Sequence, residues 1–127
     1  MLDFEPPKVN AYSLESAIAE KLQAIVSLGI FGSRMKDFYD IWFLTKNRQF
    51  DKERLTEAIE TTFKKRNTGI EEIKLIFEDE FMKDSNKANQ WVAFLRRTTI
   101  DEQVSFESVM EDLKVYFSKD LNLIKFD

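Results

Sequence analysis

The chain contains no cysteine and no histidine. Without cysteine it can form neither a disulfide bond nor a thiolate metal site, and this agrees with a reducing cytoplasm as its location. Without histidine it lacks a Ser-His or Cys-His nucleophile pair, a histidine general base and a zinc site of the usual kind. Any catalysis must therefore use Asp, Glu, Lys, Arg or Tyr, and any metal must be a hard cation, such as magnesium, on carboxylate oxygens.

Glycine and proline are scarce, with 3 and 2 residues among 127, whereas phenylalanine occurs 12 times. Such a composition favours long regular elements with few tight turns. No apolar run approaches the roughly 20 residues that span a bilayer, and the first residues carry no charged region followed by an apolar stretch. We therefore expect no membrane partner and no secretory signal. The net charge of −4 also argues against nonspecific binding of polyanions by the whole surface.

Apolar residues recur at helical spacing along most of the chain, and this predicts an all-α bundle of about six helices. Ser13 and Asp51 are good N-caps, and Gly29 or Gly32 is expected to end the first helix. The predicted helices begin near residues 13, 33, 51, 70, 86 and 105. Three of these helices have clear predicted core faces. The first helix is expected to bury Leu14, Ile18, Leu22 and Ile25. The fourth is expected to bury Ile70, Ile73, Ile76, Phe77 and Phe81, and the fifth is expected to bury Ala88, Trp91, Phe94 and Leu95.

Residues 1–12 have a different character from the rest of the chain. Pro6 and Pro7 exclude a helix there and bias Glu5 away from helical backbone angles. We expect this segment to be extended, either as a linker or as the last strand of a domain that lies upstream in a longer protein. The helical domain then covers residues 13–127.

Residues 32–42, "GSRMKDFYDIW", place charges directly in front of a strongly apolar run. Asp37 and Asp40 are three residues apart, so they occupy neighbouring positions on one helix face, at the edge of the core. Lys21 holds a similar position on the first helix, and an antiparallel pair of helices would bring it close to both carboxylates. We therefore predict a charged cluster that consists of Lys21, Arg34, Lys36, Asp37 and Asp40.

The spacing of this charged cluster is compatible with two interpretations. In the structural one, Asp37 interacts with the helix dipole, which is worth about 0.3–1 kcal/mol, and Lys21 extends along the apolar face toward water. In the functional one, the cations neutralise phosphate groups, and the carboxylates hold magnesium or orient a reacting group. The residues by themselves leave both interpretations open.

The stretch "YSLESAIAEKLQAIV … SRMKDFYDIWFL" resembles the second half of the AbiEii/AbiGii-type nucleotidyltransferase family, toxins of bacterial abortive-infection and type IV toxin–antitoxin systems. The similarity rests on residues 12–15, 19–24 and 34–40. Later positions also fit the family pattern: Phe63, Arg66, Thr68, Trp91 and Phe94. The resemblance therefore covers nearly the whole chain.

The resemblance implies an α/β half, which carries a Gly-Ser turn and the metal-binding aspartates, followed by a helical half that corresponds to this chain. It implies that Lys21 contacts a nucleoside triphosphate and that Asp37 helps to position Lys21 and to shape the pocket. Arg34, Lys36 and Asp40 would support these two residues. Magnesium would be bound mainly by the upstream nucleotidyltransferase domain. The acceptor would be tRNA, another RNA or a different nucleotide acceptor, and the 127 residues alone would be inactive.

Gly32 and Ser33, followed by two aspartates, could also be taken for the active-site motif itself. That motif needs a turn at a strand end and two Asp residues spaced by one, because side chains alternate along a strand. Asp37 and Asp40 are spaced for a helix instead, so we do not assign the motif here. The alternative function is a non-catalytic helical module whose acidic later half docks a protein partner. A ribonuclease of the helical toxin type would need a histidine.

Overall fold

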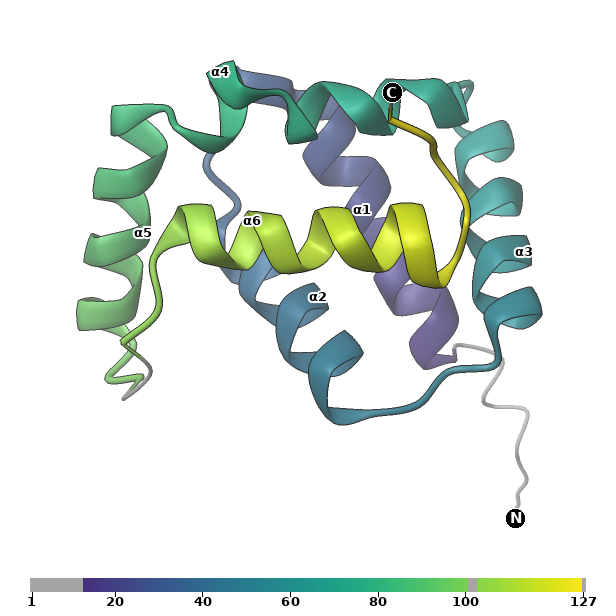
Figure 1. The fold of residues 1–127 in the computed structure, drawn as a ribbon, viewed down its shortest axis with the longest axis horizontal. Coiled ribbons are helices and arrows are strands. Elements are labelled where there is room, and N and C mark those ends of the chain that lie inside the picture. The colour runs from purple at the N-terminus through teal and green to yellow at the C-terminus, as the bar shows by residue number, and fades with distance from the viewer. Residues whose placement is uncertain (1–12, 101–102, 127) are drawn as a thin grey trace, which may run out of the picture.

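The computed structural model describes residues 13–100 and 103–126, and within them all regular structure is helical (Figure 1). The all-α prediction is therefore confirmed. The extended segment predicted for residues 1–12 lies outside the described residues. Among the residues that are described, none of the helices combines the length and the apolar character that crossing a membrane requires.

The longer helices are α1 (Leu14–Leu28), α2 (Met35–Asn47), α3 (Lys52–Lys65), α5 (Ser85–Arg97) and α6 (Phe106–Val115). Ser13 caps α1, because its side chain accepts a hydrogen bond from the Ser16 amide, and Asp51 caps α3 in the same way through the amides of Glu53 and Arg54. Gly29 ends α1 with a φ of 61°, a backbone conformation that glycine adopts more readily than other residues. The N-caps predicted at Ser13 and Asp51 are thus confirmed, and Gly29 is the one of the two expected glycines that ends the first helix.

Shorter elements join these helices: a 3₁₀ turn η2 (Gly29–Phe31), a 3₁₀ helix η3 (Ile70–Phe77), a single turn α4 (Asp79–Met82) and a π-helical turn η4 (Tyr116–Asp120). The continuous helix predicted from residue 70 to residue 81 is therefore wrong. Ile70, Ile73 and Ile76 are spaced by three residues, and this places them on one face of a 3₁₀ helix, which has three residues per turn. The predicted apolar face is correct, but the helix type is different.

In Figure 1, α1 and α3 run in one direction, whereas α2 and α5 run in the opposite one. Helix α1 packs against both α3 and α2, while η3 and α4 lie across one end. Helix α6 crosses the middle of the molecule and contacts α2, α4, α5 and η3. The Trp42 indole on α2 donates a hydrogen bond to Asp112 Oδ2 on α6, over 2.9 Å, and this contact fixes α2 against the crossing helix.

Two predicted core positions are exposed. Leu14, in the first turn of α1, is 39% exposed, and Ala88 on α5 is also exposed. The buried face of α5 contains Lys87, Trp91 and Phe94 instead, with Leu95 half-buried. Lys87, Trp91 and Phe94 follow the i, i+4, i+7 spacing of one helical stripe, so the predicted face is correct at Trp91 and Phe94, whereas Lys87 takes the place predicted for Ala88.

Candidate functional site

The first helical turn of α2 faces the middle of α1, because the two helices run in opposite directions (Figure 1). The Lys21 ammonium of α1 therefore lies between two carboxylates of α2. Its Nζ is 3.2 Å from Asp37 Oδ1 and 3.1 Å from Asp40 Oδ2. Asp37 and Asp40 can share one lysine because residues three apart on a helix project from the same side.

The two remaining cations complete the cluster from α2 and from the residue before it. The Arg34 guanidinium donates from Nε to Asp37 Oδ2, and Lys36 Nζ lies 2.8 Å from Asp40 Oδ2. All members of the predicted charged cluster thus belong to one connected network. Three cations face two carboxylates, so the cluster keeps one uncompensated positive charge.

The carboxylates of the cluster lie deeper than the cations. The Asp37 and Asp40 side chains are 11% and 24% exposed, against 29% for Lys21, 45% for Arg34 and 75% for Lys36. An anion that approaches from solvent therefore meets positive groups first. The buried carboxylates hold these groups in place from behind.

Lys21 stays charged in this environment. Burial by itself lowers the pKa of the Lys21 ammonium, but hydrogen bonds and charge attraction from Asp40 and Asp37 outweigh burial and raise the pKa above its ordinary value. Protonated Lys21 therefore persists at neutral pH, as binding of a phosphate group requires.

Arg34 has a backbone conformation that is rare for its residue type. Its φ and ψ are both 40°, in the left-handed region, where residues other than glycine are uncommon. Such a conformation costs on the order of 1–3 kcal/mol and persists where the surrounding structure imposes it. Here the residue immediately precedes α2, its carbonyl accepts from the amides of Asp37 and Phe38, and its side chain turns onto Asp37.

The cluster does not fit a magnesium site. Magnesium needs several oxygen ligands in octahedral arrangement, whereas Asp37 and Asp40 are each already engaged by two cations. Nor do three or more acidic residues converge on a possible metal position anywhere in residues 13–100 and 103–126. Gly32 and Ser33 precede a helix and not a strand, so they do not form the active-site turn described above.

A hollow of about 510 Å³ opens beside the cluster. Arg34 and Lys36 line it from one side, and Gln90 and Arg97 line it from α5. Lys21 and Asp37 do not line this hollow, although Asp37 contacts Arg34, which does. The spacing of charges in the sequence predicted the cluster, but it gave no sign that α5 would form the opposite wall.

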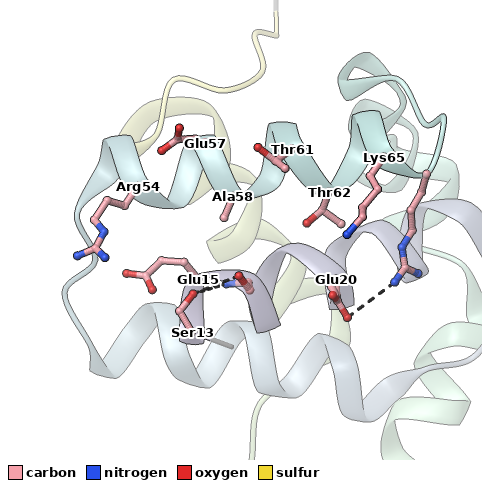
Figure 2. Close-up of a pocket in the computed structure, with 11 residues that line it drawn as sticks. Ser13, Glu15, Glu20, Arg54, Glu57, Ala58, Thr61, Thr62 and Lys65 are labelled. Atoms are coloured by element: carbon pink, nitrogen blue, oxygen red, sulfur yellow. Dashed lines mark hydrogen bonds and ion pairs between the residues drawn. The ribbon is translucent and has the colours of Figure 1, made fainter. Parts of the chain in front are cut away.

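A larger hollow of about 710 Å³ lies elsewhere, between α1 and α3 (Figure 2). Its walls mix Glu15, Glu20 and Glu57 with Arg54, Lys65 and Arg66. Arg66 Nη2 lies 3.8 Å from Glu20 Oε1, so part of this charge is satisfied internally. Because its acidic and basic residues balance, this groove favours an anion less than the charged cluster does. We therefore regard the cluster as the candidate site, although the groove is larger.

Comparison with known families defines the class of protein. The family model described as nucleotidyl transferase AbiEii toxin, type IV TA system, matches residues 1–112. The chain therefore belongs to this family, and the matched range includes α1, α2 and every residue of the charged cluster. No curated protein and no solved structure matches the chain.

Proposed function

We propose that this chain forms the helical part of a nucleotidyltransferase toxin and that its charged cluster binds the triphosphate of a nucleotide substrate. The observation that carries the proposal is the seam between α1 and α2. There a lysine that stays protonated lies between two carboxylates, with two more cations toward solvent. Membership in the AbiEii family supports nucleotide transfer as the reaction.

Each residue of the cluster has a distinct task in this proposal. Lys21 contacts phosphate oxygens, and Asp37 positions Lys21 and Arg34 by accepting hydrogen bonds from both. Asp40 holds Lys21 from its other side. Arg34 and Lys36, which are more exposed, support the phosphate groups from the rim. Such preorganised cations need little rearrangement when the substrate arrives, and this is the main way proteins stabilise charge in phosphoryl transfer.

Magnesium, which the family resemblance implies, has no place in this cluster, and no step of the proposal depends on it here. We assign the metal to the aspartates of an upstream nucleotidyltransferase domain. The 127 residues alone should therefore not catalyse transfer. The proposed acceptor is tRNA or another RNA, and the proposed location is the cytoplasm.

Substitution in the full-length toxin tests the assignment. Lys21→Ala or Asp37→Ala should reduce nucleotide transfer on the order of 100-fold or more and abolish toxicity, because the first removes a charge contact to the reacting phosphates and the second removes the group that positions Lys21. Lys64→Ala, which removes an exposed lysine from α3, is the matched control and should remain toxic. Circular dichroism verifies that the helices persist in each variant.

Retained toxicity in both cluster variants would overturn the assignment and favour the non-catalytic interaction module. A second assay addresses the need for an upstream domain. The 127-residue chain is incubated with radiolabelled nucleoside triphosphates, magnesium and total tRNA. Transfer of label that disappears in Lys21→Ala would show that this chain is catalytically complete, contrary to the proposal.

A further inference from the structure

A continuous surface runs along α5 and combines two hollows. The first, of about 510 Å³, borders the charged cluster, and the second, of about 520 Å³, lies between Phe31 and the start of α5. Gln90 lines both of them. The segment that joins α1 to α2 forms the opposite wall, and Figure 1 shows it descending beside α5. We call this surface the α5 channel and define it by Phe31, Arg34, Lys36, Asn89, Gln90 and Arg97.

One half of the α5 channel is positive. Arg34, Lys36 and Arg97 line the first hollow, and no carboxylate does. Arg97 forms no ion pair with any other residue that the structure describes. Arg34 uses Nε for Asp37, so the N–H groups on its two terminal nitrogens can still meet a further anion. This half of the channel therefore suits a chain of phosphate groups.

The other half offers a flat aromatic ring and amide groups. Phe31 is 96% exposed, although a phenylalanine normally buries its ring. Asn89 and Gln90 lie opposite, and their amides can both donate and accept hydrogen bonds. The carboxylate of Asp84 also lines this hollow, but it caps α5 by accepting from the Lys87 amide over 2.9 Å.

Lys87 fixes the spacing between the two walls of the channel. Its ammonium is buried and donates a hydrogen bond to the Gly32 carbonyl, one residue after Phe31. This bond anchors the connecting segment to α5. The exposed ring and the cations are therefore held on a rigid frame, which reduces the entropy lost when a ligand binds.

We propose that the α5 channel binds a single-stranded RNA segment, with its phosphates on Arg97 and one unpaired base stacked on Phe31, and that Arg34 and Lys36 border both this segment and the triphosphate. Cations that follow a backbone, an exposed ring and nearby amides are the features by which proteins recognise unpaired nucleotides. The aspartate and glutamate side chains of an acidic peptide would satisfy the cations but offer no aromatic group to stack on the ring. The inference deepens the proposed function, on which it rests, because the segment would be the acceptor.

The test measures binding without catalysis. The 127-residue chain is titrated into a short, fluorescently labelled single-stranded RNA of mixed sequence, at several salt concentrations, and anisotropy is recorded. Arg97→Ala should weaken binding about tenfold at low salt and reduce the slope of log affinity against log salt by about one. Arg96→Ala, the neighbouring arginine at the same helix end, does not line the channel and should stay within about twofold.

The stacking contact has its own matched pair. Phe31→Ala should weaken binding about tenfold, because the base loses its platform. Phe43→Ala removes another partly exposed phenylalanine, which lies on α2 and does not line either hollow, and should have no effect. Equal losses for Arg96→Ala and Arg97→Ala, full binding by Phe31→Ala, or equally tight binding of polyglutamate would each overturn the inference.

The inference and the proposed function fail in distinguishable ways. Lys21→Ala should retain RNA binding in this assay, because Lys21 does not line the channel. Suppose that Lys21→Ala loses transfer while Arg97→Ala and Phe31→Ala bind RNA as tightly as wild type. This result would disprove RNA binding in the channel but not the triphosphate site. Suppose instead that Arg97→Ala and Phe31→Ala weaken RNA binding while Lys21→Ala keeps full transfer. This result would disprove the triphosphate site but not RNA binding in the channel.

Discussion

Two lysines hold neighbouring parts of the fold, and their surroundings differ: Lys21 contacts α2, whereas Lys87 contacts the segment that joins α1 to α2. Lys21 at the α1–α2 seam keeps 29% of its side chain exposed and meets two carboxylates. Lys87 on α5 is 2% exposed, donates to the Gly32 carbonyl and lies 5.3 Å from the centre of the Phe81 ring.

The two environments change the pKa in opposite directions. Burial lowers the pKa of Lys87, and the charge of Asp84 opposes this only in part. Burial acts in the same direction on Lys21, but Asp40 and Asp37 outweigh it and raise the pKa. Carboxylate neighbours thus make Lys21 a durable positive charge that can serve a ligand. Without such contacts, Lys87 serves as a structural link.

The largest expected effect on stability is that of Lys87→Ala. The substitution leaves a cavity where the aliphatic stem was and removes the donor of the partly buried Gly32 carbonyl, so it should lower the free energy of unfolding by about 2–4 kcal/mol. Urea unfolding followed by circular dichroism measures the loss. Lys83→Ala is the control, because Lys83 is exposed, and it should change stability by less than about 0.5 kcal/mol. Equal values for both would mean that Lys87 does not link α5 to the connecting segment.

Asp37→Asn should have the next largest effect. It leaves Lys21 and Arg34 next to each other without the charge that both contact, which should lower the unfolding free energy by about 1–2 kcal/mol. The same urea titration measures this loss. An unchanged midpoint would show that solvent, and not Asp37, satisfies the two cations.

Lys21→Met should have a small effect on stability. The substitution keeps an apolar stem against α2 and removes an ion pair that is partly open to water, so the change should be about 1 kcal/mol or less. A loss of activity without a comparable loss of stability is the signature of a functional cation. A loss of stability as large as that of Lys87→Ala would instead assign Lys21 a structural role.

The smallest expected effect is a difference in pH dependence. The raised pKa of Lys21 gives a stabilisation that is complete below its ordinary value of 10.5 and is lost as pH rises through the raised pKa. The lowered pKa of Lys87 acts oppositely: the unfolded chain binds more protons, so stability rises with pH between the lowered pKa and 10.5. Urea titrations from neutral pH to about pH 11 compare wild type with Lys21→Met and Lys87→Met.

Each variant should remove one of these two dependences of the unfolding free energy on pH. Relative to wild type, Lys87→Met should become less stable as pH rises toward 10.5, whereas Lys21→Met should approach wild type above that pH. Parallel curves for the three proteins would contradict the opposite pKa shifts.

Local spacing was enough to predict the charged cluster. Asp37 and Asp40 are three residues apart, α1 has its cap at Ser13, and a short connection makes the neighbouring helix antiparallel. These features act over one or two turns, so they can be recognised in the sequence. What the members of the cluster do stays a prediction from the sequence and the family.

Tertiary contacts decided the features that the sequence did not reveal. Lys87 is buried because the Gly32 carbonyl, 55 positions earlier, supplies its partner. Helix η3 differs for another reason: isoleucines three residues apart fit both a 3₁₀ helix and an α-helix, so the pattern could not distinguish the two.

The position of α6 has a consequence for the order in which the parts of the fold form during synthesis. Phe106, Val109 and Met110 of α6 fill the middle of the core, and Asp112 fixes α2 through Trp42. A ribosome makes α6 after every residue of the charged cluster. α2 is held against α6 only once this helix has emerged, so we expect the charged cluster to reach its final geometry only after α6 has been made.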